Sequence, residues 1–180
     1  MTDSLRKVSI FPALIFISGL LLTFACQAQT RHPGTDEDAR ALLAEFLKPG
    51  ADAKALSLKL RPTRADYEAV FEKPFAGKLE AMYEPPWKAG KIVITGKPGQ
   101  TEVLLQKIAS ADARSWSAKA NNILPGGYKK IAADIKPGQT IYTFKFVKSG
   151  EHLGMAYDGL VYVNGQWRIF PKAYRAKEES

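Results

Sequence analysis

The chain has 180 residues, of which 46% are hydrophobic and 24% are charged, and its formal net charge is +8. These proportions lie near globular averages and argue against a disordered chain or a fibrous repeat. The length suits one domain whose core needs no disulfide or metal for stability. The lysines are dispersed and lack interleaved aromatic residues, so no nucleic-acid partner is expected.

Residues 1–25 have the pattern of a signal peptide. Arg6 and Lys7 precede an apolar stretch that ends at residue 25, and the chain turns polar from residue 27. This order is typical of an export signal. A membrane-spanning helix is the alternative, because a stretch of roughly 17 residues just crosses a bilayer. Pro12 and several polar residues within the stretch argue against that alternative.

Cys26 is the only cysteine and directly follows the apolar stretch, so no disulfide can form within the chain. Together, Ala25 and Cys26 resemble the end of the lipobox of bacterial lipoproteins. That resemblance implies cleavage between residues 25 and 26, lipidation of Cys26 and a membrane anchor that needs no spanning helix. Ordinary cleavage after Ala28 stays open and would leave a free exported protein.

The mature chain stays basic without its first 25 residues. These residues hold Arg6, Lys7 and Asp3, so their removal lowers the formal charge from +8 to +7. A basic domain can favour anionic partners such as lipid headgroups or acidic polysaccharides. Dispersed lysines are also typical of an ordinary solvated surface, and that interpretation stays open.

A polar tether at 26–35 leads into four expected helices. Thr35 or Asp36 can cap the first helix, which ends before Pro49-Gly50, and the second covers 52–60. Thr63 begins the third helix with a weak capping box. The fourth begins at Pro74, a residue suited to a first turn, and Pro85-Pro86 is expected to stop it.

After these helices the hydrophobic pattern becomes extended. Strands are predicted at 91–95, 101–108 and 139–148, and a hairpin supplies two more. Between the second and third of these, the sequence predicts a helical turn from Ser110, a packed Trp116 and a loop around Asn121-Asn122 and Pro125-Gly126-Gly127. One or two helical turns are expected from 128 to 135.

The hairpin is the clearest feature of the sequence. Asn164-Gly165 favours a two-residue type I′ turn, which pairs Tyr162 with Trp167 and Val161 with Arg168. Strict alternation then puts Asp158, Leu160, Tyr162, Trp167 and Ile169 on one face, and Tyr157, Val161, Val163, Arg168 and Phe170 on the other. The Trp167 face is expected to point inward, because the opposite face carries Arg168.

This register gives Asp158 a chemical role to consider. It predicts that Asp158 lies beside Leu160 on the apolar face and does not pair with Arg168. A carboxylate there must find donors or have a raised pKa, as a general base or a cavity ligand group does. The alternative is a structural carboxylate at the rim of the sheet. The candidate binding residues are Trp116, Tyr142, Asp158, Tyr162 and Trp167.

The V-N-G-Q-W-R-I-F hairpin and the order of helices before strands resemble NTF2-like (cystatin-like) domains. The resemblance implies an α+β fold at 36–175, with N-terminal helices on a curved antiparallel sheet of about five strands and a polar tail at 176–180. It also implies a conical cavity, which in some relatives binds small molecules or catalyses and in others does neither.

Catalytic material is scarce in this chain. His32 and His152 are the only histidines, so a histidine metal site or a Ser-His-Asp triad is not expected, and neither is a cofactor. The sequence therefore favours an exported non-catalytic domain, periplasmic or membrane-anchored, that binds a small molecule or an envelope protein. The alternative is an NTF2-like hydrolase or isomerase that uses Asp158.

Overall fold

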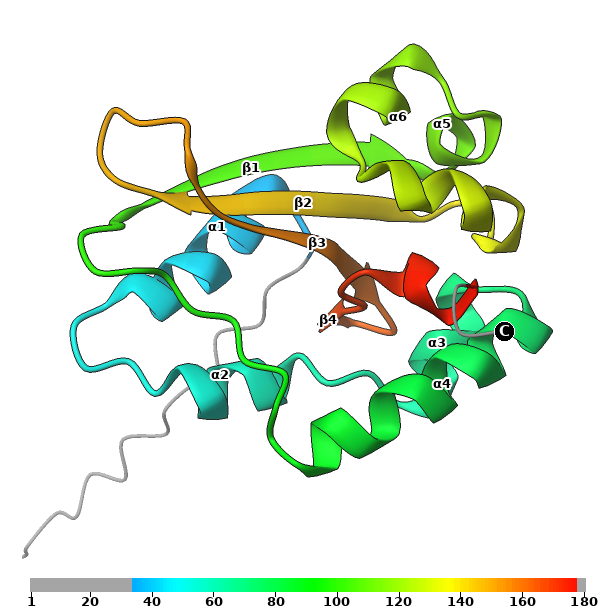
Figure 1. Cartoon of the computed structure of the whole chain (residues 1–180), viewed down its shortest axis with the longest axis horizontal. Helices are drawn as coiled ribbons and strands as arrows, with labels where there is room; N and C mark the ends of the chain where they lie inside the picture. Colours follow the sequence, from blue (N-terminus) through cyan, green and yellow to red (C-terminus); the bar gives the residue numbers. More distant parts are fainter. Residues whose placement is uncertain (1–33, 178–180) are drawn as a thin grey trace, which may run out of the picture. The chain divides into compact units, whose positions relative to one another are not determined.

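The computed structural model describes residues 34–177, in which helices come first and an antiparallel sheet follows (Figure 1). These residues belong to one compact unit. The predicted signal peptide, Cys26, His32 and the end of the polar tail lie outside the described residues. The α+β class is confirmed, with four strands in place of the expected five.

The elements follow the predicted order with shifted ends. The α-helices are α1 (Asp36–Ala44), α2 (Ala53–Lys59), α3 (Arg64–Val70), α4 (Lys73–Lys88), α5 (Ser110–Ser115) and α6 (Ala118–Ile123). The 3-10 helices are η1 (Glu45–Leu47), η2 (Gly126–Asp134) and η3 (Ala173–Lys177). The strands are β1 (Glu102–Ala109), β2 (Thr140–Val147), β3 (Gly154–Val163) and β4 (Gln166–Ile169). No helix within residues 34–177 is long and apolar enough to cross a membrane.

The predicted helix caps are confirmed. Thr35 and Thr63 each close a capping box with the aspartate three residues later. In the second box the amide of Thr63 donates to Asp66 over 2.8 Å. Because such boxes satisfy backbone donors that no helical bond can use, they fix where α1 and α3 begin.

The predicted end of α4 is wrong, because the helix continues through Pro85 and Pro86 to Lys88. The carbonyls of both prolines still accept hydrogen bonds, from Ala89 and Lys91. The extension buries Trp87, whose side chain is only 3% exposed. Burial of that large ring offsets the donors that the prolines lack.

The predicted strand at 91–95 and the predicted loop at Asn121-Asn122 are also wrong. Residues 91–95 lie in no strand, because distant hydroxyl groups bind their backbone: the Ile94 amide donates to Ser57 and the Thr95 amide to Tyr157. Asn121 and Asn122 lie within α6, whose first turn is capped by the Ser117 side chain. Contacts beyond the local sequence decide both segments.

The hairpin register is confirmed. Tyr162 pairs with Trp167 and Val161 with Arg168, as a two-residue turn requires. Asn164 and Gly165 have φ angles of 50° and 75°, the positive values of a type I′ turn. The strand order β1-β2-β3-β4 makes the hairpin one edge of the sheet.

A β-bulge in β3 overturns the predicted position of Asp158. Tyr142 pairs with Leu160 but Phe144 pairs with Tyr157, so β3 contains one extra residue there. Gly159, with φ of +80°, lies in the bulge. The extra residue moves Tyr157 onto the Leu160 face and Asp158 onto the opposite face. Asp158 still does not pair with Arg168, which binds Asp66 over 2.8 Å.

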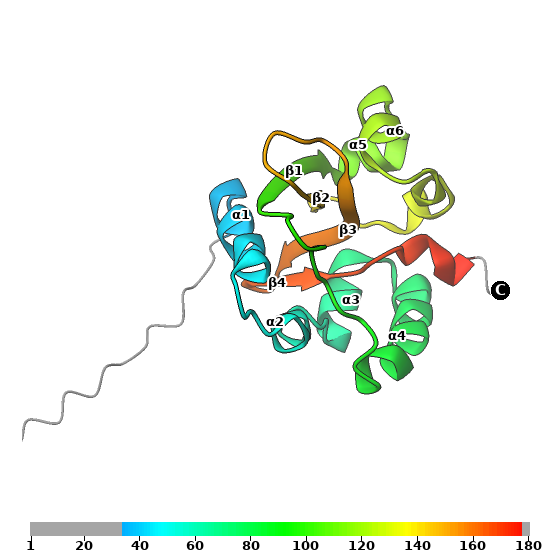
Figure 2. The same cartoon turned by 60° about the vertical axis from the view of Figure 1, so that its left-hand side comes forward.

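Helices cover both faces of the sheet. On the Trp167 face, the hydroxyl of Tyr142 donates to Asp36 of α1. On the other face, Phe170 packs edge-on against Tyr67 of α3. Figure 2 shows α1 on one side of the sheet and α5 and α6 on the other. Trp167 is buried as predicted, at 4% exposure, but its face is not the only inward one.

Gly159→Ala tests the bulge. A Cβ at Gly159 meets the carbonyl group of Phe170 and the hydroxyl of Tyr128, whereas a Cβ at Gly165 meets nothing within 4 Å. Both positions have positive φ, so Gly165→Ala should cost about 1 kcal/mol of unfolding free energy from backbone strain alone. Gly159→Ala should cost at least roughly twice as much, because backbone must also move. Urea unfolding of both variants measures the difference, and equal losses would contradict the close approach.

Candidate functional site

A groove of about 700 Å³ opens on the sheet face that carries Asp158. Cross-strand partners share a face, so the register places Leu104, Gln106, Thr143 and Ala156 beside Asp158 on the groove floor, and Lys145 on the same face with its side chain solvent-exposed. Residues 122–125, at the end of α6, form one wall, and Lys172 and Tyr174 form another. The groove thus joins three strands to two segments that are distant in the sequence.

Asp158 is held at the floor of this groove by two hydrogen bonds. Its side chain lines the groove although the residue is only 6% exposed. The Tyr128 hydroxyl donates to Oδ1 over 2.9 Å, and the Lys172 amide donates to the same oxygen over 2.7 Å. Oδ2 accepts no hydrogen bond from the described part of the chain. One carboxylate oxygen is therefore structural and the other has acceptor capacity to spare.

The surroundings raise the pKa of Asp158 above its ordinary value. Burial is the largest cause, and hydrogen bonds from Lys172 and Tyr128 together with the charges of Lys172 and Arg175 oppose it in part. Burial and the Asp158 charge in turn raise the pKa of Tyr128, so its hydroxyl keeps its proton and donates.

Asp66 shows what a fully satisfied buried carboxylate looks like in the same fold. Its Oδ2 accepts from the amide and hydroxyl of Thr63 and from Nε of Arg168, while Oδ1 accepts from Asn164. Burial acts to raise the pKa of Asp66, but these donors and the Arg168 charge outweigh it and lower the pKa. Asp66 therefore ties α3 to the hairpin and leaves no acceptor unused.

Thr143 provides a second polar group at the groove floor. It lies on β2 between Tyr142 and Phe144, opposite the bulge that carries Asp158. Thr143 is 9% exposed, and its hydroxyl makes no hydrogen bond within residues 34–177 but keeps some contact with solvent. A hydroxyl can donate and accept, so Thr143 and Asp158 give the floor complementary hydrogen-bonding groups.

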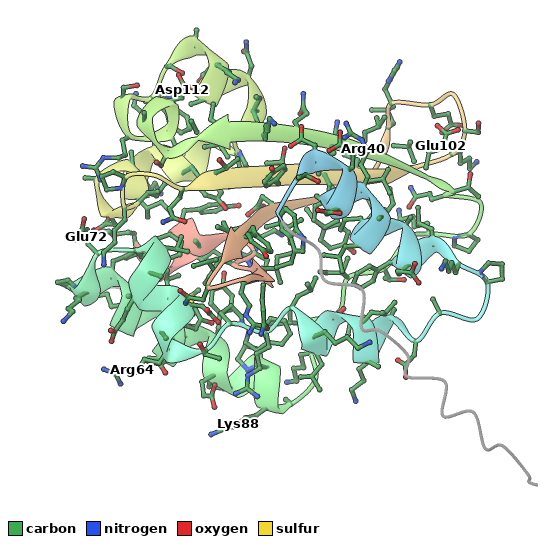
Figure 3. All side chains as sticks on the ribbon, turned by 180° about the vertical axis from the view of Figure 1, so that it is seen from behind. Arg40, Arg64, Glu72, Lys88, Glu102 and Asp112 are labelled. Carbon is green, nitrogen blue, oxygen red and sulfur yellow. The ribbon has the colours of Figure 1, made fainter. Side chains whose placement is uncertain are left out.

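Positive charge prevails around the groove. Lys145 and Lys172 contribute cationic side chains on the Asp158 face, and Arg40 of α1 contributes a third from the other side of the edge strand β1. Asp158 is the one acidic residue of the lining. Figure 3 labels Arg40 on α1, beside β1. Lys145 and Lys172 are both solvent-exposed. The buried acceptor is therefore surrounded by an accessible cationic rim.

Of the predicted binding residues, the structure brings only Asp158 to the groove. Tyr142, Tyr162 and Trp167 lie together on the opposite face, where both tyrosine rings meet the indole at centroid distances of 5.3 Å. Burial and a hydrogen bond to Asp36 raise the pKa of Tyr142 to about 12. Trp116 ends α5 with a φ of 50° and is half-buried outside the groove.

The groove residues missed by the sequence analysis belong to strands β1, β2 and β3, to helices α1, α6 and η3, and to the connections that follow α6, β2 and β4. Thr143 and Lys145 alternate with buried aromatic residues, so their pattern indicated an outward face without indicating a groove. The bulge left one local signal, a glycine directly after Asp158 in an otherwise β-branched and aromatic strand.

Residues 34–177 contain no group of three or more His, Cys, Asp or Glu side chains that could hold a metal ion. Comparison of the sequence with protein-family models and with curated proteins, and of the structure with solved structures, finds no match. The chemistry of the site therefore rests on its own geometry.

Asp158→Asn tests the raised pKa through stability. The unfolded chain releases this proton near pH 3.8, before the folded protein does. Folding thus retains the proton in the interval between the two pKa values, and this carboxyl's contribution to the unfolding free energy falls as pH rises through it. The unfolding free energy of Asp158→Asn, relative to the parent protein, should rise through that interval and level off above it. Urea unfolding from pH 3.5 to 7.5 measures this trend.

Asp66→Asn is the control of opposite sign. Because the folded pKa of Asp66 is lowered, its carboxylate stabilises the fold above the ordinary pKa, and that contribution is lost as pH falls through the folded value. The variant should lose roughly 3 kcal/mol near neutral pH, since the mostly buried Arg168 loses its charged partner. The deficit should shrink in acid. A deficit independent of pH would contradict the assignment.

Proposed function

We propose that this domain is a non-catalytic binding module that holds a small polar molecule in the groove and works outside the cytoplasm. The observation that carries the proposal is the pair formed by Thr143 and Asp158. Both residues are more than 90% buried, adjacent across two strands and provided with unused hydrogen-bonding capacity toward one groove.

Physical chemistry favours a ligand at this position. The Thr143 hydroxyl and Asp158 Oδ2 keep some contact with solvent, and a hydrogen bond that replaces one to water is worth about 0.5–1.5 kcal/mol, or more when one group is charged. A bound molecule that hydrogen-bonds to both Asp158 and Thr143 gains this amount at each residue. The groove volume of about 700 Å³ is within the range of small-molecule sites.

An enzyme that uses Asp158 is the second candidate. A carboxylate with a raised pKa at the floor of a groove suits a general base, and this is the observation that favours it. Opposed to it, Oδ1 is occupied by Tyr128 and Lys172, and the one histidine of the lining, His152, is solvent-exposed. A binding role needs no further base or nucleophile.

Blocking the groove tests the binding function. Ala156 lies on the floor and is solvent-exposed, so Ala156→Trp fills space that a ligand needs. Ala111→Trp is the matched control, because Ala111 is an exposed alanine of α5 outside the lining. Saturation-transfer difference NMR is run with neutral sugars, sugar acids, amino acids and short carboxylates. At least one class should bind the parent protein and Ala111→Trp but not Ala156→Trp.

The same samples separate the two candidates. A binding module returns every bound probe unchanged after prolonged incubation, as NMR spectra of the probes can show. Conversion of a probe that stops in Asp158→Asn, while binding persists, would favour the enzyme.

The location rests on the sequence pattern at residues 1–26. Expression of the full chain in a bacterium with lipoprotein processing should give a mature protein that begins at acylated Cys26. Intact-mass and N-terminal peptide spectrometry detects the acyl groups directly. A mature terminus at Gln29 would show a free exported protein, and an uncleaved terminus would contradict export processing.

A further inference from the structure

We infer that the molecule bound in the groove is an acidic saccharide, with its hydroxyl groups on Asp158 and Thr143 and its acid group at the cationic rim. The inference rests on the proposed function, because it names the ligand class of the same site. It follows from the difference between the floor of the groove, which offers hydrogen-bonding groups, and the rim, which carries positive charge.

The hydrogen-bonding groups at the groove floor favour hydroxyl groups on the ligand. Asp158 offers an acceptor on Oδ2, and Thr143 offers a hydroxyl that donates or accepts. A sugar hydroxyl can donate to the carboxylate while it accepts from the threonine, so a single group satisfies both. A ligand carbonyl or carboxylate at this depth would face Asp158 without a donor of its own. Acids are therefore disfavoured at the floor.

The cationic side chains at the groove rim favour a negatively charged group on the ligand. Arg40, Lys145 and Lys172 outnumber the single acid of the lining. The charges of Lys172 and Arg175 act on Asp158 itself and lower its pKa against the effect of burial. An ammonium ligand would meet this positive field on approach, whereas a carboxylate would be attracted by it. The hydrogen-bonding floor and the cationic rim together favour a molecule with hydroxyl groups at one end and an acid group at the other.

The remaining lining accommodates the faces of a sugar ring. Leu104 and Ala156 supply small apolar areas on the floor, and Ile123, Leu124 and Tyr174 supply others on the walls. The Tyr174 ring is positioned by edge contact with Tyr128, at a centroid distance of 5.7 Å. The C–H faces of a sugar pack on such surfaces while its hydroxyls remain directed to polar groups.

Four probes separate the effect of ligand hydroxyl groups from the effect of ligand charge: glucuronate, glucose, glucosamine and hexanoate. Chemical shift changes in amide NMR spectra give the affinities. Glucuronate should bind most tightly, by at least about fivefold over glucose, because it alone has both hydroxyls and an acid. Glucosamine has the wrong charge, and hexanoate has no hydroxyl groups. Added NaCl should weaken glucuronate binding, since exposed charges are screened.

Matched variants assign the contacts. Thr143→Val keeps the shape of the side chain and removes the hydroxyl, and should weaken glucuronate binding about fivefold. Lys145→Gln should weaken it about two- to fivefold through the loss of an exposed charge contact. Thr101→Val and Lys148→Gln are the controls, because both residues are exposed and lie outside the lining. These controls should bind like the parent protein.

A tetrasaccharide of galacturonate distinguishes a free sugar acid from the end of a polysaccharide. Tighter binding of the tetrasaccharide points to the polymer, and equal binding points to the monomer. Binding of glucose, glucosamine or hexanoate in preference to glucuronate, blocked by Ala156→Trp, would overturn the ligand class and leave the groove as the binding site. Absence of any probe binding sensitive to Ala156→Trp would overturn both.

Discussion

The bulge at Gly159 is the constraint on which the groove depends. Without it, strict alternation would place Asp158 among the aromatic residues of the Trp167 face. With it, Asp158 faces Tyr128 and the backbone of Lys172, and the Phe170 amide closes onto the Gly159 carbonyl over 2.8 Å. No side chain fits where Gly159 lies, because the carbonyl group of Phe170 occupies the space. The absence of a Cβ at Gly159 therefore determines on which face of the sheet Asp158 lies.

The two buried aspartates show how one fold can use the same group in two ways. Asp66 has every acceptor occupied, and its lowered pKa reflects net stabilisation of the charged form. Asp158 has donors on one oxygen alone, and burial dominates its pKa. Structural requirements explain Asp66 completely. For Asp158 they explain the two hydrogen bonds to Oδ1 but provide no donor for Oδ2 within residues 34–177, and both Asp158 and Thr143 line the groove.

Local rules predicted the parts of the fold that local chemistry controls. The caps at Thr35 and Thr63 and the turn at Asn164-Gly165 each involve residues within three positions of one another, and all three are confirmed. The wrong predictions have distant causes. The segment at 91–95 is bound by the hydroxyls of Ser57 and Tyr157, and the contacts that hold Asp158 come from Tyr128 and Lys172. The sequence alone identified Asp158 as the candidate carboxylate, but it did not predict which distant residues lie around it.

The predicted binding residues Tyr142, Tyr162 and Trp167 lie outside the groove, because they pack on the opposite face of the sheet. Tyr142, Tyr162 and Trp167 pack against one another and, through Asp36 and Gly34, against α1 and the residues before it. The rings of Tyr142 and Trp167 are buried and that of Tyr162 is partly buried, so a change to any of them is expected to lower the stability of the domain. On the other face, the part that lines the groove carries Thr143, Lys145 and Ala156, whose replacement removes little buried apolar surface. The rest of that face contributes to the core as well, because Ile141, Val161 and Phe170 are buried there. Since both faces bury apolar side chains, the domain can keep short and charged side chains at the groove.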